Sequence, residues 1–209
     1  MFTGIVREIG KVKSLLKRGA LVRLEVLCGG DLLKEIAIGA SVAINGVCLS
    51  AVRKNGSLFF DVVENTFKKT NLKRLKISSP VNLEKALKLG DDVGGHMVSG
   101  HVDGERRIKR IQKSSDKCIL EVSISPEDKK YLVSRGSVAI DGVSLTVAEV
   151  YGTFLRAYLI PHTIENTVLK FKKQNDYVNV EYDMAAKHIK NGLEGGITKD
   201  FLQHKGFLR

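Results

Sequence analysis

The sequence predicts an all-β fold in which one β-rich unit occurs twice in tandem, each copy a small six-stranded barrel, followed by a C-terminal helix. Three observations support this prediction. The segment SVAINGVCLS at positions 41–50 recurs as SVAIDGVSLT at positions 137–146, with seven of the ten residues identical. Short apolar runs alternate with glycine-containing turns in both copies. A segment with helix-capping residues follows the second copy.

The duplication covers most of the chain. An offset of 96 residues pairs Met1 with Met97, Gly4 with Gly100, and Val6 with Val102. Further along, the offset becomes 97, as between residues 81–84 and 178–181, because the second copy contains one inserted residue. Solenoid repeats have units of roughly 20–50 residues, so this longer period indicates a duplicated domain. We therefore expect domains at residues 1–96 and 97–182, then a helix with a tail at residues 183–209.

Each unit is expected to contain about six short strands. Those of the first unit are expected at residues 11–16, 21–27, 41–44, 47–53, 57–63 and 81–85. Lys17-Arg18-Gly19 separates the first two, and Asn45-Gly46 separates the next two. Asn-Gly between apolar runs is the strongest short signal for a hairpin turn. Short strands joined by tight turns favour a closed barrel, because closure removes unpaired strand edges.

Short helices are expected between the strands and after the second copy. Candidates in the first copy lie at residues 31–36 and 66–75. In the second copy, Ser125 can act as an N-cap with Pro126 at the first helical position. Asp183 can cap the final helix and Gly192 can end it.

Composition and charge narrow the class of protein. Hydrophobic residues make up 43% and charged residues 27% of the chain, which is ordinary for a soluble globular protein. No apolar run reaches 18 residues, so no membrane span is predicted. The N-terminus lacks the basic start and apolar stretch of a signal peptide, so we expect a cytoplasmic protein. The net charge of +11 would suit nucleic acid, but aromatic residues do not interleave with the basic clusters. A solvated basic surface is therefore the preferred interpretation.

No metal or nucleotide signature is present. The three cysteines, Cys28, Cys48 and Cys118, are odd in number and widely spaced, so neither a disulfide framework nor a zinc knuckle is indicated. The sequence contains no GxGxxG, Walker A, GxSxG or HExxH motif, and Asp91-Asp92 lacks the spacing of an EF-hand loop. These absences argue against nucleotide hydrolysis, dinucleotide redox and ordinary hydrolase chemistry.

Candidate chemistry lies where the two copies differ. Cys48 aligns with Ser144, each two residues after a turn, and the two side chains are similar in size but different in nucleophilicity. Ile5 aligns with His101, and a histidine that replaces an apolar residue of the sister copy is available for proton transfer near neutral pH. His96 precedes His101 by five residues; metal ligation or a structural role are the alternatives for this pair.

Several segments in order resemble the riboflavin synthase family, whose members carry lumazine-binding repeats. These segments are MFTGIV, NGVCLS, GGHMVSGHVDG, AIDGVSLTV and IPHTIENTVL with VNVEYD, and the match extends to about Asn191. The resemblance implies two six-stranded Greek-key β-barrels and a C-terminal helix around which a homotrimer assembles. It also implies the dismutation of two 6,7-dimethyl-8-ribityllumazine molecules to riboflavin and 5-amino-6-(D-ribitylamino)uracil. That no metal and no organic cofactor is needed is implied only by this resemblance.

The resemblance further implies which residues form the sites. The first barrel would bind substrate through Gly4, Ile5, Val6, Cys48, Leu49, Ser50, Asp61, Val62, Val63, Glu64, Asn65 and Thr66. The second would use Gly100, His101, Val102, Ser144, Leu145, Thr146, Tyr158, Leu159, Ile160, Pro161, His162 and Thr163, with Arg135 reaching the ligand of a neighbouring subunit. Cys48, His101 and Ser144 would carry the chemistry. His101 is expected to transfer the proton, supported by Thr146 and Ser41, and Asp183 to help organise the site.

Two rival functions stay open at this point. A non-catalytic lumazine- or flavin-binding protein of the same fold is the main alternative, although relatives of that kind have typically lost the cysteine, serine and histidine that are present here. A basic nucleic-acid-binding barrel is the second. Ser50 stands where threonine is frequent in the family, and the residue before Cys48 is not the second cysteine of some relatives. The sequence does not assign donor and acceptor lumazine to a barrel, or say whether lumazine synthase is a partner.

Overall fold

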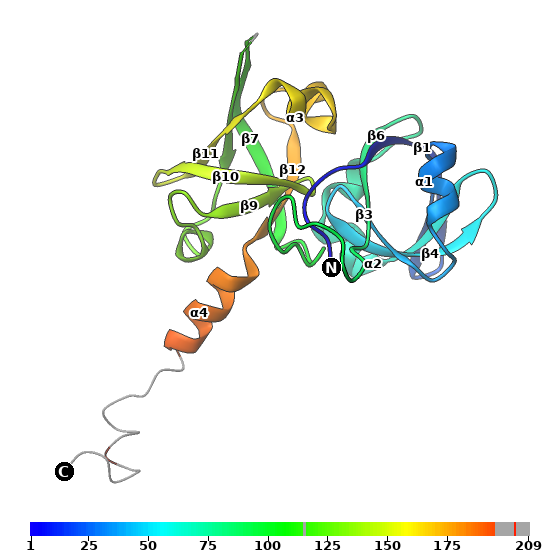
Figure 1. Cartoon of the computed structure of the whole chain (residues 1–209), viewed down its shortest axis with the longest axis horizontal. Coiled ribbons are helices and arrows are strands. Elements are labelled where there is room, and N and C mark those ends of the chain that lie inside the picture. The colour runs from blue at the N-terminus through cyan, green and yellow to red at the C-terminus, as the bar shows by residue number, and fades with distance from the viewer. Residues whose placement is uncertain (115, 195–202, 204–209) are drawn as a thin grey trace.

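The computed structural model describes residues 1–114, 116–194 and 203. Two closed antiparallel barrels lie side by side, and a helix extends away from the second barrel (Figure 1). Numbered along the chain within each barrel, the six strands lie in the order 1-2-5-4-3-6 around both barrels. Because the second strand lies beside the fifth instead of the third, each barrel has a Greek-key connection. The predicted all-β fold with two six-stranded barrels and a C-terminal helix is confirmed.

The elements of the first barrel largely match the expected turns. They are β1 (Glu8–Arg18), β2 (Leu21–Leu27), α1 (Gly30–Glu35), β3 (Ser41–Ile44), β4 (Val47–Lys54), β5 (Leu58–Val63), α2 (Glu64–Lys69), η1 (Asn71–Arg74) and β6 (Pro80–Lys85). The helix expected at residues 66–75 is two short helices. They are interrupted at Thr70, whose backbone is extended and whose Oγ1 donates to the Thr66 carbonyl at 2.8 Å.

The second barrel repeats this pattern. Its elements are β7 (Gly104–Lys113), β8 (Cys118–Ser123), η2 (Asp128–Tyr131), β9 (Ser137–Ile140), β10 (Val143–Val150), β11 (Phe154–Leu159), α3 (Pro161–Glu165), η3 (Val168–Phe171) and β12 (Tyr177–Tyr182). The helix expected after Ser125 is only a single 3-10 turn that begins at Asp128, and the Asp128 N–H donates to Ser125 Oγ at 3.3 Å.

The final helix, α4 (Met184–Glu194), begins where the sequence predicts. Asp183 Oδ1 accepts from the Ala185 N–H at 2.8 Å, which caps the first turn. The helix continues through Gly192 to Glu194, so the predicted end at Gly192 is wrong. A glycine lowers helix stability by only about 1 kcal/mol, which does not stop a helix by itself. Except for Gln203, the predicted tail after Glu194 lies outside the described residues.

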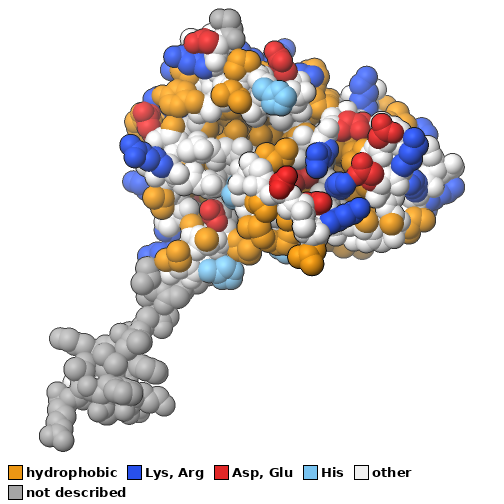
Figure 2. Space-filling model, in the orientation of Figure 1, with side chains coloured by type: hydrophobic (Ala, Val, Ile, Leu, Met, Phe, Trp, Pro, Cys, Tyr) orange, Lys and Arg blue, Asp and Glu red, His pale blue; other side chains and the backbone are white. Residues whose placement is uncertain are grey.

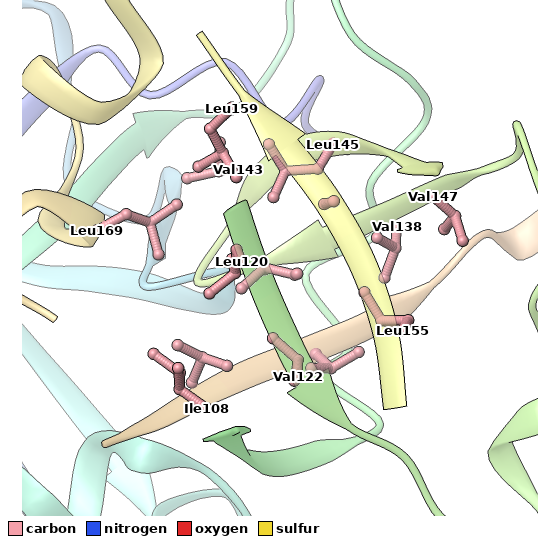
Figure 3. Packing of buried hydrophobic residues seen from close by; sticks show 14 of the residues in the cluster. Ile108, Leu120, Val122, Val138, Val143, Leu145, Val147, Leu155, Leu159 and Leu169 are labelled. Atoms are coloured by element: carbon pink, nitrogen blue, oxygen red, sulfur yellow. The ribbon is translucent and has the colours of Figure 1, made fainter. Parts of the chain in front are cut away.

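Each barrel has its own apolar core. Alternate residues of each strand point inward, which is the reason for the period-two burial along strands such as β10. Figure 3 shows this packing in the second barrel, where Ile108, Leu120, Val122 and Leu155 meet with no exposed surface. On the face shown in Figure 2, the Lys and Arg side chains are dispersed among acidic ones. This distribution fits the expected solvated basic surface.

The two predicted hairpin turns meet at the interface between the barrels. Asn45 and Asp141 have φ of 46° and 47°, and Gly46 and Gly142 have φ of 79° and 76°, so both turns have left-handed conformations at both central residues. This is the two-residue turn that Asn-Gly and Asp-Gly favour. A Cβ on Gly46 would lie 2.7 Å from Gly142 N, and the reverse contact would be equally short. Glycine is therefore required for the turns to touch.

A buried amide network connects the barrels around these turns. Asn82 Nδ2 donates to the Asp141 carbonyl and Asn179 Nδ2 donates to the Asn45 carbonyl, both at 2.8 Å. The Asn179 carbonyl oxygen Oδ1 also accepts from the Asn71 N–H at 2.7 Å. Asn82 and Asn179 occupy matching positions, β6 and β12, of the two copies. The network therefore repeats about the pseudo-twofold axis that relates the barrels.

Asn179→Ala is expected to lower the free energy of unfolding by roughly 2–4 kcal/mol, because it leaves a buried Asn71 N–H and a buried Asn45 carbonyl without partners. Denaturation in urea measures the loss. Asn55→Ala, at an exposed turn position, is the control and should change stability by no more than about 0.5 kcal/mol. Equal stability of the two variants would contradict this role of the network.

Candidate functional site

The first residues of each copy cross to the opposite barrel. The Gly4 carbonyl accepts from the Ser144 N–H at 2.8 Å, and the Gly100 carbonyl accepts from the Cys48 N–H at 2.9 Å. Since Gly4 matches Gly100 and Ser144 matches Cys48 in the duplication, the two contacts are equivalent. Each copy therefore completes the hairpin of the other.

The crossing brings its apolar residues with it. Val6 packs against the core of the second barrel, and Val102 packs against the core of the first. Between the two crossings, Phe2 and Val98 exchange backbone hydrogen bonds of 2.7 and 3.0 Å and are both buried. The expectation that the start of each copy completes the pocket of its own barrel is wrong, because the crossing moves it to the other barrel.

Glycine makes the close approach of the crossing segments possible. Gly4 has φ +75° and Gly100 has φ +82°, in the left-handed region. A Cβ on Gly4 would lie 2.6 Å from Ser144 Cβ, and one on Gly100 would lie 2.5 Å from Cys48 Cβ. The predicted site residues Gly4 and Gly100 thus act through their backbone.

Two buried carboxylates hold the crossing segments in place. Glu84 accepts from the Thr3 N–H and Oγ1 at 2.7 and 2.9 Å, and from the Gly4 N–H at 3.1 Å. Glu181 accepts in the same way from Ser99 and the Gly100 N–H. Burial raises the pKa of Glu84, although the hydrogen bonds from Thr3 and Gly4 oppose the shift. The sequence prediction missed these anchors, although their place in the repeated segments VNLE and VNVE could have indicated them.

The crossing thus groups the predicted residues into two composite candidate sites. Site 1 combines Cys48 and the first-barrel residues with the segment that carries His101. Site 2 combines Ser144 and the second-barrel residues with the segment that carries Ile5. The two sites therefore differ in composition. Site 1 contains Cys48 and His101, and site 2 contains Ser144 and Ile5.

The predicted binding residues alternate between core and surface. Leu49, Val62, Leu145 and Leu159 have buried side chains that belong to the barrel cores, so only their backbone groups can meet a ligand. The neighbouring positions are open to solvent and comprise Ser50, Val63, Glu64, Asn65, Thr146, Tyr158, Ile160, Pro161 and His162. Thr66 and Thr163 are half-buried at the two equivalent helices.

The supporting residues lie close to the same hairpins. Ser41 pairs with Ser50 on the hairpin that carries Cys48, and Thr146 lies two residues beyond Ser144 on β10. Asp61 forms a two-point contact with Arg23, with both N···O distances at 2.7 Å. Hydrogen bonding from Arg23 lowers the pKa of Asp61, so the carboxylate stays ionised.

A surface hollow of about 470 Å³ lies between the crossing segment that carries Ile5 and the helix α3. Its lining includes Ile5 and Val6 from the crossing segment and His162 from α3, which supports a shared role for these three predicted residues. The linker before the second copy adds a polar contact, because His96 Nδ1 lies 2.7 Å from Ser144 Oγ. His96 was noted in the sequence but not included among the predicted site residues.

Arg135 lies apart from both hairpin turns, in the loop before β9. Its φ of +68° is in the left-handed region, which costs an L-residue roughly 1–2 kcal/mol. The matching position of the first copy is Gly39, with φ +86°. The second copy thus has Arg135 at a left-handed backbone position where the first copy has a glycine, which adopts this conformation without strain.

Within residues 1–114 and 116–194, no group of three or more His, Cys, Asp or Glu side chains is arranged to hold a metal ion. Among the described helices, none is both long and apolar enough to cross a membrane.

Comparison with known proteins identifies the repeat and its relatives. The model of the lumazine binding domain matches twice, at residues 3–86 and 99–183. Riboflavin synthase from Actinobacillus pleuropneumoniae is 37% identical over 99% of this chain and its own full length. Riboflavin synthase from Bacillus subtilis (strain 168) is 38% identical with the same coverage.

Solved structures agree with the fold. LumP complexed with riboflavin superposes with a TM-score of 0.81 over 87% of this chain and 99% of that chain, at 24% identity. LumP complexed with 6,7-dimethyl-8-(1'-D-ribityl) lumazine gives a TM-score of 0.79 at 23% identity, over the same shares. The two domain matches and the full-length relatives lead to one conclusion: the chain belongs to the riboflavin synthase family and is an enzyme built from two lumazine-binding repeats.

Proposed function

We propose that the chain catalyses the dismutation of two 6,7-dimethyl-8-ribityllumazine molecules to riboflavin and 5-amino-6-(D-ribitylamino)uracil. The observation that carries this proposal is the similarity to riboflavin synthases across both barrels and 99% of the chain. The reaction consumes two copies of one substrate, and the duplication supplies two related sites. Holding both molecules in the reacting orientation would provide much of the rate gain.

The unequal composition of the sites supports unequal roles for the two lumazines. One lumazine must lose a proton from its C7 methyl group, and the resulting carbanion is delocalised into the ring. The other is attacked by this carbon and gives up a four-carbon unit to the first, which leaves it as the diaminouracil. Cys48 and Ser144 are the proposed nucleophilic residues, and His101, exposed in site 1, is the proposed proton-transfer residue. A protein that only binds lumazine would not need this difference between the sites.

The purified chain is expected to convert the lumazine to riboflavin and the diaminouracil in equal amounts. Replacing His101 by alanine should lower turnover by about 10²-fold or more, because a general acid–base group is removed. Flavin absorbance follows the reaction, and circular dichroism verifies the fold. Binding of lumazine without any flavin formation would overturn the proposed activity, and full turnover of His101→Ala would overturn the role of this residue.

We further propose that the enzyme is a homotrimer built around α4, with each active site between subunits. The helix extends away from the barrels (Figure 1), and its Ile189 side chain is 65% exposed. Ile189 and Val133 border a hollow of about 360 Å³ whose lining is mainly apolar. An apolar surface of this kind on a projecting helix fits burial against other copies of the chain.

Ile189→Lys is expected to shift the protein from trimer to monomer and to lower turnover, because a charge would enter the proposed interface. Sedimentation velocity measures the assembly state. Ile77→Lys, an exposed isoleucine of the first barrel, is the matched control and should stay trimeric. A monomeric wild type that is fully active would contradict the proposed assembly.

The proposed role of Arg135 is to contact the ligand bound in a neighbouring subunit. Arg135→Gly should keep or raise the unfolding free energy, by up to about 1 kcal/mol, because glycine tolerates the left-handed φ. The same change should raise KM roughly tenfold, since a charged hydrogen-bond donor is lost. Arg135→Lys keeps the charge and should retain more affinity. A KM that stays unchanged in Arg135→Gly would exclude ligand contact.

Two further expectations stay predictions: the domain limits at residues 96 and 182, and the cytoplasmic location. Association with lumazine synthase is an alternative that the sequence leaves open. The matched ranges of the lumazine binding domain, 3–86 and 99–183, support the domain limits.

A further inference from the structure

We propose that His96 is a positioning residue for the chemistry of site 2, where it holds the Ser144 hydroxyl and exchanges a proton with it. This inference rests on the proposed dismutation and deepens it. It assigns the loss of the C7-methyl proton to the lumazine bound at site 2, with Ser144 as the catalytic residue and His96 acting through it, and leaves to His101 the proton transfers of the facing lumazine at site 1.

The geometry of the linker supports this role. His96 Nδ1 lies 2.7 Å from Ser144 Oγ, within hydrogen-bond distance. The His96 N–H donates to the Thr3 carbonyl at 3.1 Å, which fixes the backbone that carries the imidazole. A Cβ on Gly95 would lie 2.1 Å from the Thr3 carbonyl oxygen, so the linker passes in contact with the crossing segment. The contact with Thr3 therefore fixes the linker backbone beside Ser144.

The two crossing segments supply different side chains to the two sites, and His96 adds a histidine to the site that receives an isoleucine. Site 1 receives His101 from its crossing segment, whereas site 2 receives Ile5 from the equivalent crossing segment. The linker residue His96 supplies site 2 with a histidine from a different direction. Site 2 thus has an imidazole within hydrogen-bond distance of the Ser144 hydroxyl, in addition to the His162 side chain on α3.

The surroundings of His96 favour its neutral form near neutral pH. Burial lowers the pKa of His96, while the negative charges of Asp183 and Glu181 oppose the shift. Glu181, on β12, is occupied by Ser99 and the Gly100 N–H, and Asp183 caps α4. A neutral imidazole can accept a proton at Nδ1, and the nearby carboxylates would stabilise the cation that forms.

The proposed step balances without another reactant. The C7-methyl proton moves to Ser144 Oγ while the Oγ proton moves to His96 Nδ1. This leaves a lumazine carbanion and an imidazolium. After the carbon–carbon bonds have formed and the four-carbon unit has been transferred, the proton passes back from His96 through Ser144 and ends on the diaminouracil that the facing lumazine has become. No net proton is gained or lost.

The test compares His96→Asn, Ser144→Ala and the double variant with the wild type. An asparagine side chain places its amide near the position of Nδ1, so it can keep the hydrogen bond to Ser144 without accepting a proton. We expect His96→Asn to bind lumazine with affinity within about twofold of the wild type. Its kcat should fall by about 10²-fold, the usual contribution of a positioned acid–base group.

The pH profile separates proton exchange from a purely structural role. In the wild type, kcat should fall as pH decreases through the lowered pKa of His96, because protonation removes the acceptor. This fall of kcat at acidic pH, the acidic limb of the profile, should be absent in His96→Asn. Ser144→Ala and the double variant should show the same loss of kcat, because both residues serve one step. His101→Asn combined with Ser144→Ala is the control pair, and its losses should multiply, since His101 belongs to site 1.

Two results would refute different parts of the proposal. Failure of the wild type to form riboflavin would refute the proposed function. An active wild type whose His96→Asn variant keeps both kcat and the acidic limb would refute the role of His96 alone.

Discussion

The exchange of backbone hydrogen bonds between the two copies is the constraint on which the rest of the structure depends. Gly4 and Gly100 present their carbonyls to Ser144 and Cys48 at 2.8 and 2.9 Å. Only a residue without a Cβ can approach so closely in the left-handed conformation. Each barrel thereby takes part of its site from the other copy, so neither site is a property of one barrel. The buried carboxylates Glu84 and Glu181 fix the same segments from the opposite side.

This exchange explains how a repeated scaffold produces two different sites. The duplication retains the glycines, the turns and the anchoring carboxylates, because both halves must fold and dock in the same way. The residues that differ, Cys48 and Ser144 or Ile5 and His101, belong to neither barrel core, although Cys48 packs against the small apolar cluster of Phe2 and Val98 between the barrels. The crossing places Cys48 with His101 and Ser144 with Ile5. The linker then adds His96 to the site that contains Ser144. An enzyme that treats two identical substrates differently requires such an inequality.

The two copies also differ at the interface between the barrels, where Asn45 of the first turn corresponds to Asp141 of the second. Asp141 is fully buried, its Oδ1 accepts from Asn71 Nδ2 at 2.7 Å, and its Oδ2 lies 3.0 Å from Lys172 Nζ. At the positions matching Asn71 and Lys172, the other copy has Val168 and Leu75, and there the turn residue is the neutral Asn45. Burying a carboxylate costs free energy unless a cation and a hydrogen-bond donor compensate it. The charged Asp141 therefore occurs together with Lys172 and Asn71, whereas the neutral Asn45 needs neither partner. The Asn45/Asp141 difference therefore reflects packing at the interface.

The sequence by itself determined the duplication, the turn chemistry and the residues at which the copies diverge, because these depend on local spacing and on comparison within one chain. The strands, the Asn-Gly and Asp-Gly turns and the Asp183 cap follow from local preferences that tertiary contacts did not override. Only the tertiary structure decided which residues share a site. Gly4 and Ser144 are far apart in the chain, and nothing in the local sequence of either indicates that the segments cross. The contacts of Glu84, Glu181 and His96 also depend on this crossing, and for that reason their roles became visible only in three dimensions.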